Sequence, residues 1–125
     1  MPWDFQTDRP IYLQIMEHFE AGILAGEYPA GSRLDSVRDL AAEAAVNPNT
    51  MQKALAELER KGLLYSNRTS GRYITDDDSV IRQLRKDLAE KKVSLFLSQM
   101  VQMGFEKEEL IQLIEEGSTY AATNY

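Results

Sequence analysis

Three polar side chains recur at helical spacing in the middle of the chain: Asn49, Gln52 and Lys53. On an α-helix these positions share one face, which Ala56 continues one turn later. Amide side chains donate and accept hydrogen bonds together, as an adenine edge requires, and an ammonium group binds phosphate. The face carries no carboxylate, which phosphate would repel. This pattern is typical of a surface that contacts nucleic acid.

Residues suited to catalysis are scarce. The sequence has no Cys and one His, His18, which stands among Glu17 and Glu20. A thiolate metal site, a Cys nucleophile or a His-based metal site therefore lacks its partners. We predict no catalytic residue, no metal ligand and no cofactor, and we assign His18 no role. The absence of Cys is consistent with a reducing cytoplasm.

Composition indicates a folded globular protein of 125 residues with 43% hydrophobic and 27% charged residues. No run of residues is long and apolar enough to span a membrane, and the first residues lack the pattern of a signal peptide. We therefore expect a cytoplasmic protein without a membrane partner.

The net charge of −6 by itself argues against a nucleic-acid partner, but its distribution is uneven. Residues 32–72 contain seven basic and five acidic residues, so the acidic excess lies elsewhere. Asp76, Asp77 and Asp78 follow directly, and we interpret them as a solvated hinge and helix start rather than a metal site.

Apolar periodicity predicts a first helix between Asp8, as its cap, and Gly26, with a loop over residues 27–33. A short second helix should begin after Ser36. A third helix should begin at Pro48, with Asn47 as its cap, and end at Gly62. The third helix should turn four apolar residues inward: Met51, Ala54, Leu55 and Leu58.

Two β-prone runs, residues 63–66 and 72–75, flank a turn and predict a hairpin. A long amphipathic helix that ends near Gly104 and a last helix after Phe105 should follow. The predicted fold is mainly α with a small β-hairpin, a winged helix-turn-helix domain over residues 1–78 and a helical tail over residues 79–125.

Two short helices joined by a few residues, with a polar second helix and a hairpin, match the geometry that places a recognition helix in the DNA major groove. Thr50 and Ser36 stand near helix starts, where hydroxyl groups can donate to phosphate. Arg38 is predicted to clamp a phosphate or a base; its alternative is a surface ion pair with Asp35 or Asp39.

The chain resembles the GntR family of bacterial regulators over about residues 9 to 75. The resemblance rests on motifs in the family's order, namely ProIleTyrLeuGlnIle (10–15), GlySerArgLeuAspSerValArgAspLeuAla (31–41), ValAsnProAsnThrMetGlnLysAla (46–54), LeuGluArgLysGlyLeuLeu (58–64) and GlyArgTyrIle (71–74). Asp35 stands where the family usually has Pro, and the wing is less basic than usual.

The resemblance implies contacts to double-stranded DNA from the helices and from the wing near the minor groove. Carried over by position, these contacts are Ser36, Arg38, Asn49, Thr50, Gln52, Lys53, Arg68, Ser70, Gly71 and Arg72.

The remainder, with GlyPheGluLysGluGluLeuIleGlnLeuIle (104–114), looks like the YtrA subfamily, whose two-helix tail dimerises. The tail's apolar stripe is also too long for one small domain to hide. The dimerisation residues predicted are Ile81, Leu84, Leu88, Leu95, Phe96, Met100, Met103, Leu110, Leu113 and Ile114. Phe96, Met100 and Met103 could instead line a pocket for an unknown small-molecule effector.

The leading hypothesis is thus a homodimeric, sequence-specific transcriptional regulator that reads a palindromic operator, and the resemblance implies repression. A winged-helix module that binds protein is the alternative, because fold alone does not fix function. An enzyme is the third class and lacks a converging set of titratable groups.

Overall fold

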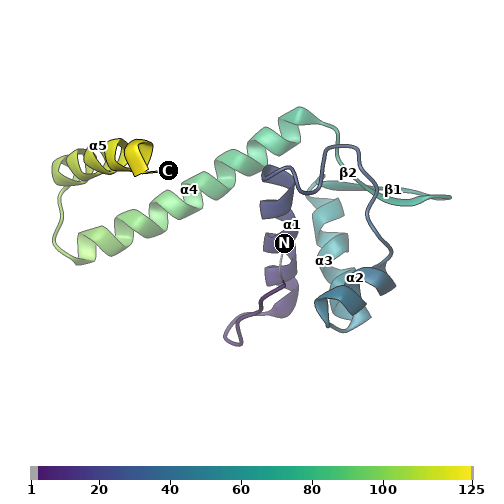
Figure 1. Ribbon diagram of the computed structural model, residues 1–125. Helices are drawn as coiled ribbons and strands as arrows, with labels where there is room; N and C mark the ends of the chain where they lie inside the picture. The colour runs from purple at the N-terminus through teal and green to yellow at the C-terminus, as the bar shows by residue number, and fades with distance from the viewer. Residues whose placement is uncertain (1–2, 125) are drawn as a thin grey trace. The chain divides into compact units, whose positions relative to one another are not determined.

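The computed structural model describes residues 3–124, with side chains as far as residue 117. Its elements are α1 (Ile11–Leu24), α2 (Val37–Ala44), α3 (Pro48–Arg60), β1 (Leu64–Asn67), β2 (Gly71–Ile74), α4 (Asp78–Gln102) and α5 (Lys107–Asn124) (Figure 1). The mainly helical fold with one hairpin is therefore confirmed. The chain forms two compact units, which divide between Arg85 and Lys86.

The core of the first unit lies between α1 and α3, which run side by side (Figure 1). Ile15 and Phe19 of α1 and Met51, Leu55 and Leu58 of α3 belong to this core, and each is at most 1% exposed. Burying one such side chain contributes about 1.5–3 kcal/mol, so this contact is a large part of the domain's stability. The inward face predicted for the third helix is confirmed.

Two polar contacts hold α1 and α3 in parallel register. At the end of both helices, Nζ of Lys61 lies 2.7 Å from Oε2 of Glu20, which is only 5% exposed. At their start, Nζ of Lys53 lies 3.9 Å from the centre of the Tyr12 ring. A buried carboxylate without a partner would be costly, so the Glu20–Lys61 pair selects this register.

The helix starts of α2 and α3 are capped as predicted. Oγ of Ser36 accepts a hydrogen bond from the amide of Asp39 at 3.2 Å, and Oδ1 of Asn47 accepts from the amide of Asn49 at 2.7 Å. Pro48 occupies the first turn of α3, where its missing N–H costs nothing. These caps fix where α2 and α3 begin.

The cap predicted at Asp8 is wrong. The N-cap position of α1 is Pro10, and no side chain caps the helix. The preceding segment is held instead by the buried Gln14, whose amide accepts from the backbone N–H of Gln6 and donates to the carbonyls of Gln6 and Arg9 at 2.7–2.9 Å. This contact spans up to eight residues, and periodicity does not show it.

The hairpin is antiparallel, with Leu64 opposite Ile74 and Asn67 opposite Gly71, and each strand lies one residue nearer the turn than predicted. Residues 31–34, which include the end of the loop predicted over residues 27–33, pair with the outer side of β2. The amide of Leu34 donates to the carbonyl of Arg72 at 2.9 Å, and the amide of Ile74 donates to the carbonyl of Ser32 at 2.8 Å. The wing is therefore supported by a third extended segment.

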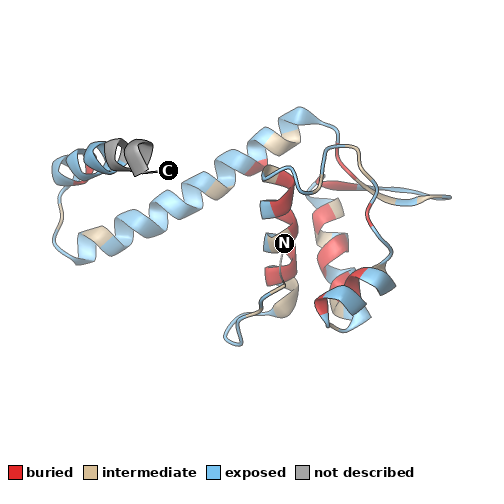
Figure 2. Cartoon of the chain, viewed as in Figure 1, coloured by how far each residue is buried: buried red, intermediate tan, exposed pale blue. Residues whose placement is uncertain are grey.

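Most residues of the tail helices whose burial is described are exposed (Figure 2), and many of these exposed residues are apolar. Leu95, Met103 and Ile114 are 62%, 67% and 52% exposed. Leu84 and Leu110, also predicted at the dimer interface, are already buried within the single chain. Among the described residues, no helix has both the length and the apolar character that crossing a membrane demands.

The turn after α2 contains the one non-glycine residue with positive φ in the described chain, Ala45, at +57°. This conformation costs an L-residue roughly 1–2 kcal/mol, and glycine avoids that cost. Ala45→Gly should therefore raise the free energy of unfolding by up to roughly 1 kcal/mol, net of the entropy that glycine adds to the unfolded chain. Urea unfolding measures the change.

Ala42→Gly is the matched control, because Ala42 is exposed and helical in α2. It should lower the free energy of unfolding by roughly 0.5–1 kcal/mol. A change in the free energy of unfolding with the same sign for both variants would contradict the strain at Ala45.

Candidate DNA-binding surface

The polar face of α3 points outward because the opposite face is buried against α1. Asn49, Gln52, Lys53 and Ala56 are exposed, and Thr50 is half-buried near the helix start. The side chains of Asn49 and Gln52 are accessible for bidentate hydrogen bonds to a base edge. The structure thus presents the predicted face to solvent, while the DNA contacts themselves stay predictions.

The start of α2 contributes two further groups. Oγ of Ser36 uses a lone pair to cap Asp39, so its hydroxyl hydrogen is free to donate to phosphate. Arg38 is exposed, and in the described part of the chain it forms no ion pair with Asp35 or Asp39. Its guanidinium can therefore meet an anion without first leaving a carboxylate.

Lys53 has a partner that the sequence did not reveal. Its ammonium lies over the ring of Tyr12, 3.9 Å from the centroid, so an aromatic ring of α1 forms a cation–π contact with a lysine of α3. The lysine remains exposed on its other side. The first turn of α1 therefore borders the surface that α2 and α3 present.

The predicted wing residues have different environments. Arg68 is exposed, while Ser70 is half-buried and its hydroxyl accepts a hydrogen bond from that of Tyr73 at 2.8 Å. Gly71 has a φ of +105°, a conformation that glycine adopts without strain. The stacked rings of Tyr65 and Tyr73, with centroids 5.5 Å apart, stiffen the hairpin behind this turn.

Arg72 has a structural role in this geometry. Its Nε donates to Oε1 of Glu59 at 2.6 Å, and the Ser66 hydroxyl donates to the same oxygen at 2.5 Å. Burial by itself would raise the pKa of Glu59, but these two hydrogen bonds and the Arg72 charge outweigh it and lower the pKa. The network ties the end of α3 to both strands, so Arg72 is not a free cation.

Arg33 was missed by the sequence analysis. It lies in the segment that pairs with β2, and its Nε donates to the backbone carbonyl of Ser70 in the wing turn at 2.5 Å. No local pattern could have found it, because the two residues are 37 positions apart.

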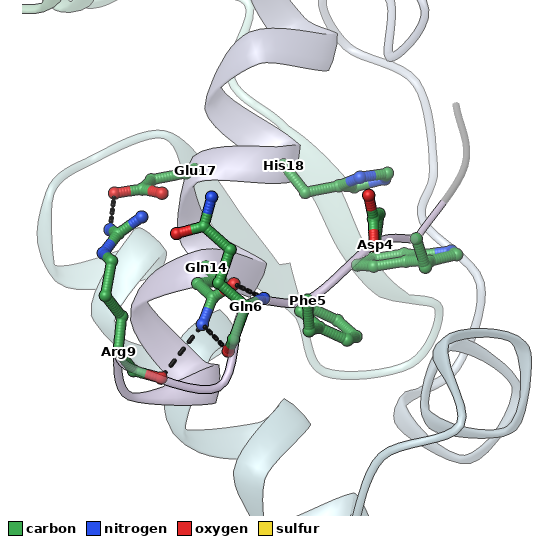
Figure 3. A pocket seen from close by; sticks show the side chains of 8 residues that line it. Asp4, Phe5, Gln6, Arg9, Gln14, Glu17 and His18 are labelled. Atoms are coloured by element: carbon green, nitrogen blue, oxygen red, sulfur yellow. Dashed lines mark hydrogen bonds and ion pairs between the residues drawn. The ribbon is translucent and has the colours of Figure 1, made fainter.

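A cavity of about 260 Å³ lies between the N-terminal segment and α1 (Figure 3). His18 stacks on Trp3 with ring centroids 3.6 Å apart, and its Nε2 lies 3.0 Å from the Tyr28 hydroxyl. Burial lowers the pKa of His18. An ion pair between Arg9 and Glu17 closes one side. His18, to which the sequence assigned no role, packs the N-terminal segment.

The profile of the gntR family of bacterial regulatory proteins matches residues 11–74, which is just over half of the chain. The chain belongs to this family. The match covers α1, the helix-turn-helix and the wing, so the family resemblance inferred from the motifs is confirmed. The protein is a transcriptional regulator with a GntR-type helix-turn-helix DNA-binding domain, and its relatives are regulators rather than enzymes.

Three relatives match nearly the whole chain. The uncharacterized HTH-type transcriptional regulator YhcF of Bacillus subtilis is 34% identical over 89% of this chain and 92% of its own. The HTH-type transcriptional repressor YtrA of the same organism is 34% identical over 90% and 88%. A solved GntR family regulator from Listeria monocytogenes is 40% identical over 90% and 98%, with a TM-score of 0.83. The tail is therefore part of the similarity.

The Glu59 network makes stability depend on pH. A carboxylate whose pKa is lowered by folding stabilises the folded state at pH values above its ordinary pKa of 4.5. This stabilisation is lost as the pH falls through the lower pKa of the folded state. Glu59→Gln should therefore be less stable than wild type at neutral pH, and the gap should narrow below pH 4.5. Chemical unfolding at several pH values measures the gap.

Glu57→Gln is the control, because the two side chains are similarly exposed, at 32% and 30%, and Glu57 pairs only with Arg60 on its own helix. A gap for Glu59→Gln that is constant across this pH range would rule out the proposed role of the carboxylate.

Proposed function

We propose that the protein is a homodimeric repressor that reads an inverted-repeat operator with α3 in the major groove and the wing near the minor groove. The observation that carries this proposal is the exposed face of Asn49, Gln52 and Lys53, flanked by Ser36 and Arg38. These five residues are the recognition surface. Bacterial DNA lies in the cytoplasm, where we propose the protein acts.

The recognition surface combines the two kinds of contact that specific DNA binding needs. Arg38, Lys53 and the Ser36 hydroxyl suit phosphate, which positions a protein on the duplex, whereas the amides of Asn49 and Gln52 suit base edges. The acidic total of −6 reduces nonspecific attraction to DNA, so local geometry has to supply the affinity.

The exposed apolar side chains of the tail support a dimer. Leu95, Met103 and Ile114 would remain in water in a monomer, and patches of this kind mark association surfaces. Two-fold symmetry then places two recognition helices on one duplex, with half-sites about one turn, ~34 Å, or a multiple of it apart. The relative named YtrA is a repressor, which supports repression here.

The second candidate is a winged-helix module that binds protein, and the acidic net charge is the observation that favours it. A protein partner would not require the cations of the recognition surface to be intact. The DNA titrations separate the two functions, because a module that binds only protein would show no sequence-selective, salt-dependent binding to DNA.

Arg38→Ala and Lys53→Ala should each weaken operator binding by about 1–3 kcal/mol, because each removes a charged contact. Gel-shift titrations on the promoter region of the protein's own gene, with footprinting to locate the operator, measure the loss. Lys91→Ala, an exposed cation of α4, is the matched control and should bind like wild type.

Unchanged operator binding by both recognition-surface variants would contradict the proposal that Arg38 and Lys53 contact DNA. Wild-type binding that no sequence competes for better than random DNA, or that does not change with salt, would refute the proposed function.

Leu95→Glu and Ile114→Glu should convert the dimer to a monomer, because each places a charge on the exposed apolar face of the tail. Light scattering coupled to size-exclusion chromatography measures the mass against 14.2 kDa for one chain. Ala89→Glu, at an exposed position of α4 that is not among the predicted dimerisation residues, should stay dimeric. A wild-type mass equal to one chain at micromolar concentration would contradict the dimer.

A further inference from the structure

The wing turn contains a basic side chain that comes from a distant segment. Residues 31–34 run beside β2, and Arg33 forms a bridge with Tyr73. Two backbone hydrogen bonds of 2.8 and 2.9 Å, from Ile74 to Ser32 and from Leu34 to Arg72, fix Arg33 between them. Its backbone position is therefore as well defined as that of a strand residue.

The guanidinium of Arg33 is anchored at one edge. Its Nε donates to the carbonyl of Ser70 at 2.5 Å, in the turn that joins β1 and β2. A methyl group built on Gly71 would lie 3.6 Å from Nε and Nη2, so the guanidinium packs against the bare backbone of this glycine. The side chain thus lies on the wing turn itself.

The charge of Arg33 is not neutralised by a neighbour. In the described part of the chain no carboxylate pairs with it, whereas Arg72, the arginine of β2, is bound to Glu59. The residue is exposed, and the hydrogen bond to Ser70 uses only Nε. The two Nη groups are therefore left to donate to an external acceptor.

We propose that Arg33 is a DNA-contacting residue of the wing, which binds the phosphate backbone beside the groove that the wing approaches. The inference rests on the proposed function. An arginine already held by Nε loses less side-chain freedom on binding than a free one, and its planar fork suits phosphate oxygens. The strands of the wing contain one arginine, Arg72, and Glu59 neutralises its charge. Arg33 and Arg68 therefore provide the positive charge of the wing.

The test compares Arg33→Ala and Arg33→Lys in operator titrations across salt concentrations. Arg33→Ala should weaken binding roughly five- to 100-fold and reduce the slope of log affinity against log salt by about one. Arg33→Lys keeps the charge, so it should retain the slope and lose less affinity. Arg85→Ala, which removes an exposed arginine of α4, is the control and should change neither.

The salt slope distinguishes a DNA contact from a role that only supports the turn, because a structural loss does not change the number of phosphates neutralised. A wild-type slope for Arg33→Ala, or equal weakening by both variants, would overturn the inference. Random-sequence duplex provides the same slope test if no operator is found, in which case the proposed function fails while Arg33 is still tested. Wild-type protein that binds no DNA would refute both.

Discussion

The burial of one stripe of α3 against α1 is the contact on which the other features of the first unit depend. Met51, Leu55 and Leu58 of α3 are fully buried, as are Ile15 and Phe19 of α1, and burying this stripe determines the rotation of α3 about its axis. The opposite face, which carries Asn49, Gln52 and Lys53, is therefore exposed. The chemistry of the surface is thus a consequence of the core.

Polar contacts then refine what the apolar core leaves free. An apolar stripe tolerates sliding, whereas the buried Glu20 carboxylate must meet Lys61, and this pair sets how far along α1 the third helix lies. Tyr12 and Lys53 lie near the other end of the same contact. The register of two helices therefore decides which residues border the recognition surface.

The protein has a net charge of −6, yet its free cations are placed selectively. Glu59 neutralises Arg72, and this ion pair joins α3 to the hairpin. Arg72 therefore has a structural role. Arg38 and Arg68 have no carboxylate partner among the described residues and face solvent. Counting charges along the chain cannot separate these two kinds of arginine, because pairing is decided by spatial neighbours.

By itself, the sequence determined several features that arise from local geometry: the inward and outward faces of α3, the caps at Ser36 and Asn47, the hairpin and the GntR family motifs. Periodicity and capping act over three or four residues, so they can be read along the chain. The strands were one residue off and the cap at Asp8 was wrong, since pairing and the Gln14 contacts override local preference there.

Only the tertiary structure decided which side chains are already engaged. Tyr12 against Lys53, Glu59 with Arg72, and Arg33 on the carbonyl of Ser70 join residues between 13 and 41 positions apart. Such contacts form because the core brings distant segments together, and no local spacing encodes them. That is why the exposure of the polar face of α3 could be predicted from the sequence, while the contacts of Arg33 and Arg72 at the wing could not.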